Sequence, residues 1–192
     1  VRGDFTPYWE DGAGSSSRET ALARNAAERL VQAETLWSLL RREAYPRDAF
    51  AQAWSNVLLY NDHTWGAHCS ISQPDSDFTK AQWRIKQTFA VDADRQSQTL
   101  LDSAAAVSRA PVADTVTALD VHNTASWPRT ELVVLPAWKR AGDVVRQAEG
   151  PPVRSQRLSD GRLAFLACDV PPLGAKRFWI EPGLIPGVAG SA

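Results

Sequence analysis

Apolar residues recur at steps of three and four residues in the first part of the chain. This spacing places them on one face of a helix, with charged residues between them. The members of this stripe are Leu22, Ala26, Leu30, Ala33, Trp37 and Leu40. The spacing predicts a helix from about Arg18 to the pair Arg41 and Arg42, because cations suit a helix C-terminus. Such a helix needs a partner to bury its apolar face.

A second helix is expected to start at Pro46, since the fixed φ and missing N–H of proline are tolerated in a first turn. It should end close to Asn61. The residues expected on its apolar face are Phe50, Ala53, Trp54, Val57 and Leu58. This second stripe gives the first helix a partner.

A third helix is expected from about Asp77 to about Val107, with Ser76 or Asp75 as its cap. Its expected apolar face comprises Phe78, Ile85, Phe89, Ala93, Gln96, Leu100 and Val107. Gln96 is the polar member of this stripe. Three long helices joined by loops predict a three-helix bundle.

After Pro111 the composition changes to short runs rich in β-branched residues. These runs occupy residues 115–123, 131–136, 162–170 and 176–182. The turn signals WPRT, EGPP, SDG and PPLG separate them. Short strands at a spacing of about ten residues predict a β-sandwich or part of one. We therefore expect an α+β chain with a loop at 1–17, a helical bundle at 18–110 and the start of a β-sandwich at 111–192.

Composition excludes several classes of function. The formal net charge of −1 gives no electrostatic reason to expect nucleic acid or an anionic membrane as a partner. No apolar run approaches the roughly 20 residues that a membrane span needs. Cys69 and Cys168 are too far apart for a metal knuckle and too few for a disulfide framework. Methionine is absent even at position 1, so we expect a piece of a longer protein.

Residues 58–72, LLYNDHTWGAHCSIS, contain two of the three histidines, His63 and His68. On a continuous helix these residues would lie about 140° apart, and Gly66 disfavours such a helix. A single imidazole at the end of a packed helix is a good zinc ligand, because the helix fixes where its nitrogen points. The alternative is a polar turn between helices. His68 is interpreted as a structural or solvent-facing loop residue, and the strand residue His122 as structural.

Other candidate site residues also have two interpretations. Trp9, beside Tyr8, can form an aromatic platform under a sugar ring or a loop aromatic buried against the bundle. Carboxylates suited to acid–base catalysis are present, but their spacing selects no pair. They are Glu10, Asp11, Asp62, Asp75 and Asp77.

Several segments, in this order, resemble the middle portion of glycoside hydrolase family 38, the α-mannosidases. They are GDFTPYWEDGAGSSSRE (3–19), NAAERLVQAETLWSLL (25–40), LLYNDHTWGA (58–67), VHNTASWPRTELVVLP (121–136) and DVPPLGAKRFWI (169–180). The family's GDF segment matches residues 3–5, and its strand of the form NPLSWxR matches residues around Trp127 and Arg129. The resemblance covers nearly the whole chain.

This resemblance implies a three-helix middle domain, the start of a β-sandwich domain and a zinc site to which His63 contributes one ligand. It implies that Trp9 lies near the substrate. The family's catalytic carboxylates and remaining zinc ligands belong to an upstream α/β domain, so no catalytic residue is assigned in this chain. Thr64 replaces the family's Asp after the ligand histidine, and Asp62 can supply a carboxylate from the other side.

Two functions follow as hypotheses. The first is a segment of a zinc-dependent retaining glycosidase that acts on α-mannosides or related glycans. In it His63 would bind Zn²⁺, and Trp9, Asp62 and Trp65 would contact the carbohydrate substrate. The segment alone would be inactive without its upstream α/β catalytic domain. The second is a non-catalytic carbohydrate-binding or interaction module.

Overall fold

The computed structural model describes residues 16–62, 69, 72–105, 117–137 and 144–183. The chain divides into two compact units, Val1–Val107 and Ser108–Ala192. Helices make up the described part of the first unit and strands that of the second. The expected α+β class, with three helices before the strands, is confirmed.

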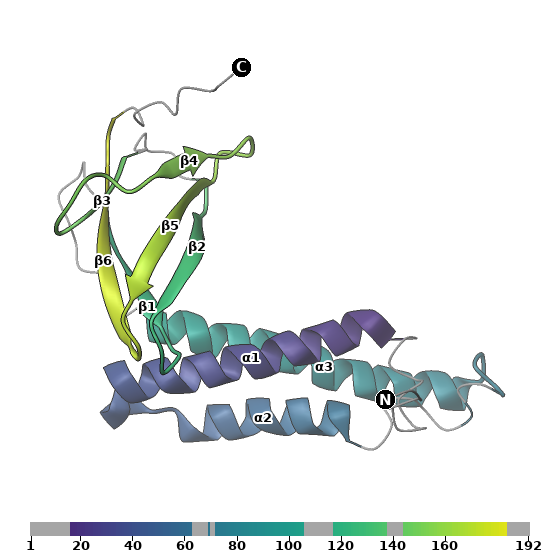
Figure 1. Ribbon diagram of the computed structural model, residues 1–192. Helices are drawn as coiled ribbons and strands as arrows, with labels where there is room; N and C mark the ends of the chain where they lie inside the picture. Colours follow the sequence, from purple (N-terminus) through teal and green to yellow (C-terminus); the bar gives the residue numbers. More distant parts are fainter. Residues whose placement is uncertain (1–15, 63–68, 70–71, 106–116, 138–143, 184–192) are drawn as a thin grey trace, which may run out of the picture. The chain divides into compact units, whose positions relative to one another are not determined.

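The first unit is built from α1 (Ser17–Leu40), α2 (Arg47–Asn61) and α3 (Asp77–Ala105), with a short 3₁₀ turn, η2 (Arg42–Ala44), between α1 and α2. α1 and α3 run in the same direction and α2 runs against both (Figure 1). Contacts near both ends agree: Trp37 Nε1 donates to the Leu100 carbonyl over 3.0 Å, and Gln87 Nε2 donates to Glu19 over 2.9 Å. None of the described helices is long and apolar enough to cross a bilayer.

The inward face of α3 differs from the expected stripe at its start. Its buried residues are Thr79, Ala90, Ala93, Ser97, Leu100 and Ala104, and Trp83 and Lys86 continue the same row half-buried. This row steps by four and three residues in turn, as in coiled-coil packing. Phe78 and Ile85 are 61% and 59% exposed, so the prediction that they belong to the core is wrong. On α2, the expected core residue Leu58 is also exposed, at 65%.

Ser97 and Gln96, two polar residues of α3 that face the other helices, have hydrogen-bond partners there. Ser97 Oγ accepts from Arg29 Nε of α1 over 3.1 Å. Gln96 Oε1 accepts from Asn56 Nδ2 of α2 over 2.9 Å. Buried polar groups are tolerated when each has a partner. Gln96, the polar member of the expected stripe, therefore forms a hydrogen bond between α2 and α3.

The start of α3 is capped by Ser76. Its hydroxyl oxygen accepts from the backbone N–H of Thr79 over 3.2 Å. This is the usual geometry of a helix N-cap. Asp75, the other expected cap, instead forms an exposed ion pair with Lys80.

The second unit consists of two three-stranded antiparallel sheets. One has the order β1 (Thr117–Asn123), β6 (Gly174–Glu181), β3 (Val144–Gln147), and the other β2 (Arg129–Leu135), β5 (Leu163–Val170), β4 (Ser155–Arg157). The two sheets share one apolar core, in which the Phe165 and Phe178 ring centroids lie 5.0 Å apart. This arrangement is consistent with the expected part of a sandwich.

Asn123 organises the turn that joins β1 to β2. Its Nδ2 donates to the carbonyls of Trp127 over 2.7 Å and Val170 over 3.1 Å. Its Oδ1 accepts from the N–H of Ala125 over 2.9 Å. The asparagine of the recognised VHNTASWPRT segment therefore holds the backbone of this turn in place.

The observed register of α3 predicts that one substitution lowers the stability of the helical unit and that another leaves it almost unchanged. Ala90→Leu should lower the free energy of unfolding by about 1–3 kcal/mol, because extra volume strains a packed interface. Ile85→Ala should change it by no more than about 0.5 kcal/mol, as expected for an exposed side chain. Urea unfolding followed by circular dichroism at 222 nm measures both. If Ile85→Ala cost several kcal/mol and Ala90→Leu cost nothing, the observed register would be wrong and the apolar face expected from sequence would be correct.

Candidate functional site

The start of α1, the end of α2 and the start of α3 lie at the same end of the bundle (Figure 1). Three hydroxyl groups join two of these helix ends. The Tyr60 hydroxyl lies 3.1 Å from Ser16 Oγ and 2.9 Å from Thr20 Oγ1. Tyr60 is 1% exposed, so this hydroxyl depends on protein partners. The contacts fix the point where α1 begins against the last turn of α2.

Lys86 of α3 binds the C-terminus of α2. Its Nζ donates to the backbone carbonyls of Leu59 and Asp62, each over 3.0 Å. These carbonyls have no partner within the helix, and the helix dipole favours a cation there. Burial lowers the pKa of Lys86, and the nearby negative charge of Asp62 opposes this shift. All three helices are thus connected at this end.

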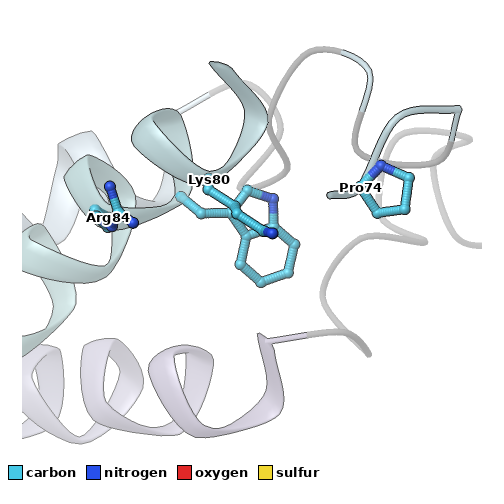
Figure 2. Close-up of a pocket in the computed structure, with 4 residues that line it drawn as sticks. Pro74, Lys80 and Arg84 are labelled. Carbon is cyan, nitrogen blue, oxygen red and sulfur yellow. The ribbon is translucent and has the colours of Figure 1, made fainter. Parts of the chain in front are cut away.

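Two hollows adjoin Trp83 in the second turn of α3. The larger, of about 360 Å³, is lined by Pro74, Lys80, Trp83 and Arg84 (Figure 2). The smaller, of about 120 Å³, also includes Trp83 and Arg84. Its other lining residues are Glu19, Tyr60 and Gln87, so it is bordered by all three helices. An indole, two cations and several hydrogen-bonding groups therefore share this end of the bundle.

Comparison with solved structures identifies the fold. A glycosyl hydrolase family 38 protein from Enterococcus faecalis matches 89% of this chain with 25% of its own length, at 18% identity and a TM-score of 0.53. An alpha-mannosidase from Enterococcus faecalis V583 matches 88% of this chain with 25% of its own, at 18% identity and a TM-score of 0.52. The chain shares the fold of a family 38 segment. The resemblance expected from sequence is thereby confirmed at the level of the fold.

This family 38 likeness has defined limits. The chain spans about a quarter of the length of the two solved structures. No family model matches the sequence, and neither does any curated protein. The likeness therefore establishes a family 38 fold for this segment, while activity and ligands have to be argued from the site.

Of the predicted site residues, Asp62 lies within the described part of the family 38-like fold. It follows α2 directly, is exposed, and contributes its backbone carbonyl to the Lys86 contact. His63, Trp65 and Trp9 lie outside the described residues. So does His68. The described structure thus gives the helix ends from which the segments carrying His63 and Trp9 continue.

The described residues alone do not make a zinc site in the family 38 manner. Within the ranges that the structure describes, no three His, Cys, Asp or Glu side chains gather around a common point. A zinc ion next to α2 would need His63 together with ligands from outside these ranges. His122, interpreted as structural, lies in β1, where it pairs across the sheet with Ala175 of β6.

Sequence reasoning missed Trp83, Lys80 and Arg84. Trp83 lies about 140° around the helix from Phe78, outside the expected stripe. The available signal was the tryptophan itself, with cations three residues before it and one residue after it. The prediction that Phe78 and Ile85 lie in the core turned Trp83 toward solvent, so Trp83 was not considered as part of a site together with Lys80 and Arg84.

The Lys86 contact predicts a loss of stability that a neighbouring lysine does not share. Lys86→Met should lower the free energy of unfolding by about 1–3 kcal/mol, since two carbonyls lose a charged donor. Lys80→Met is the control, because its exposed ion pair with Asp75 is worth about 0–1 kcal/mol. Urea unfolding of both variants measures the difference. Equal stability of the two variants would contradict a role for Lys86 at the end of α2.

Proposed function

We propose that this chain is the middle segment of a zinc-dependent retaining glycoside hydrolase that acts on α-mannosides or related glycans. The observation that carries the proposal is the family 38 fold, shared over 89% of the chain with a quarter of a family 38 structure. One of the two similar structures is described as an alpha-mannosidase. The coarser statement, a segment related to glycoside hydrolases in fold, does not depend on the proposed zinc site.

The proposed metal ligand is His63. It follows Asp62, whose carbonyl is held by Lys86, so the chain reaches residue 63 from an anchored helix end. An anchored backbone supports ligation, because it limits the positions that the imidazole can take. Bound zinc would act as a Lewis acid on sugar hydroxyl groups.

The proposed substrate contacts are Trp9, Asp62 and Trp65. Trp9 precedes α1 by a few residues, and α1 begins where Ser16 contacts Tyr60. Because α2 ends beside the same tyrosine, segments far apart in sequence continue from one end of the bundle. The two carboxylates of a retaining mechanism, a nucleophile and an acid–base group, would come from an upstream α/β domain.

The metal proposal is tested on the complete protein in which this chain occurs, using two histidines of the same segment. Elemental analysis should find about one zinc per chain in the wild type and in His68→Ala, and little in His63→Ala. Hydrolysis of an aryl α-mannoside should fall together with the zinc content. If the wild type contained no zinc, the metal proposal would be refuted, and the segment around His63 would be a polar turn between helices. Equal loss in both variants would also contradict the assignment of His63.

The substrate contacts predict a second set of effects in the same protein. Trp9→Ala and Trp65→Ala should each lower kcat/KM for the aryl α-mannoside at least tenfold, about 1.4 kcal/mol of lost transition-state binding. Trp127→Ala is the control, because Trp127 is an exposed tryptophan of the strand unit. Unchanged kcat/KM in the first two variants would show that these tryptophans are not part of the substrate wall.

A further inference from the structure

The larger hollow beside α3 carries chemistry that the proposed zinc site does not use. Pro74 lies on one side of it, across the open space from Lys80 and Arg84 (Figure 2). Its volume of about 360 Å³ is at the lower end of the range of small-molecule sites, about 300–1,000 Å³. A site of this size suits one sugar unit better than an extended chain.

Lys80, Trp83 and Arg84 form a continuous patch on α3. Trp83 and Arg84 follow Lys80 by three and four residues, so each of them is a neighbour of Lys80 on the helix surface. The half-buried indole offers a flat apolar surface with a polar edge. Lys80 and Arg84 add two positive charges beside it. Stacking against a sugar ring uses the indole, while the cations call for a ligand that is also anionic.

Both cations are accessible to a ligand. Lys80 Nζ lies 3.3 Å from Asp75 Oδ1, but the two side chains are 48% and 95% exposed. Exposed pairs of this kind contribute about 0–1 kcal/mol, so an incoming anion can replace Asp75 at small cost. Arg84 is exposed, and its planar guanidinium can donate two parallel hydrogen bonds to a phosphate or carboxylate.

The smaller hollow extends this patch toward the hydroxyl groups of the bundle end. Trp83 and Arg84 line both hollows, and Tyr60 lines the smaller one. Glu19 also lines the smaller hollow, and its carboxylate accepts from Gln87 Nε2 over 2.9 Å and lies 3.6 Å from Arg18 Nη1. A ligand on Trp83 would therefore lie at the end of the bundle where α2 ends (Figure 1).

As an extension of the glycosidase function proposed above, we propose that this hollow binds an anionic sugar. The sugar ring stacks on Trp83, and its phosphate or carboxylate group pairs with Lys80 and Arg84. The hollow thereby selects charged glycans over neutral ones.

Isothermal titration of the complete protein in which this chain occurs tests this with four probes: mannose 6-phosphate, mannuronic acid, mannose and inorganic phosphate. At least one anionic sugar should bind about 10–100-fold more tightly than mannose, as expected for one or two charge-assisted hydrogen bonds. A preference for one of the two identifies the anionic group as phosphate or carboxylate. Equal binding of all three sugars overturns the proposal. So does inorganic phosphate that binds as tightly as mannose 6-phosphate, because the indole would then add nothing.

Variants of exposed residues connect any such binding to the hollow. The double variant Lys80→Met, Arg84→Met should bind the anionic sugar no more tightly than mannose. Arg95→Met, which removes an exposed arginine further along α3, should keep the full preference. Trp83→Phe should weaken binding of the anionic sugar while retaining a preference for it. Persistence of the full preference in the double variant overturns the proposal.

The outcome is separable from that of the proposed function, because these probes contain no glycosidic bond. A complete protein that holds zinc through His63 and hydrolyses α-mannosides, but shows no charge preference, refutes the anionic-sugar site alone. A charge preference that depends on Lys80 and Arg84, in a protein without zinc or hydrolysis, refutes the glycosidase alone.

Discussion

Close contact between α1 and α3 is the constraint on which the helical unit depends. Small residues make this contact possible, because alanine and serine let two helix backbones approach one another. Ala26 and Ala33 of α1 are fully buried in one core cluster with Ala93 of α3. At such a narrow interface, a polar side chain that loses water must find a partner within the protein. The pairing of Ser97 with Arg29 meets this requirement.

The same constraint decides what could be predicted from the sequence. The helix limits were accessible, because local chemistry marks them: Pro46 immediately precedes α2, and Ser76 caps α3. The inward face of α3 could not be predicted, because the row of residues that faces the other helices contains Thr79, Lys86 and Ser97. From sequence, each of these polar residues is expected at the surface, because its hydrogen-bond partner in the fold is not known. Meanwhile the exposed Phe78 and Ile85 satisfied a simple count of apolar residues.

The strand unit shows a related limit. The four longer strands, β1, β2, β5 and β6, overlap the runs that composition singled out, since β-branched and aromatic residues gather there. Strands β3 and β4 were missed. They are four and three residues long and flank the turn around Gly150, where the local sequence indicates a loop. Pairing with β6 and β5, which a sequence window cannot detect, makes them strands.

Sequence motifs assign His63 and Trp9 to the candidate site, and both assignments stay predictions, because these residues lie outside the described ranges. The group around Trp83 belongs to no such motif. It emerged only from the packing of α3, because the register of that helix decides which of its side chains border the hollows.

The hydroxyl trio of Ser16, Thr20 and Tyr60 has a consequence for how such a chain can change in evolution. One residue inserted between Thr20 and the core of α1 would turn Thr20 by about 100° around the helix axis and break its contact with Tyr60. Two inserted turns, seven residues, would nearly restore its direction but lengthen the helix by about 10 Å. Insertions in α1 would therefore need matching changes in α2. The lengths of these two helices are coupled, whereas surface turns of the strand unit can vary one residue at a time.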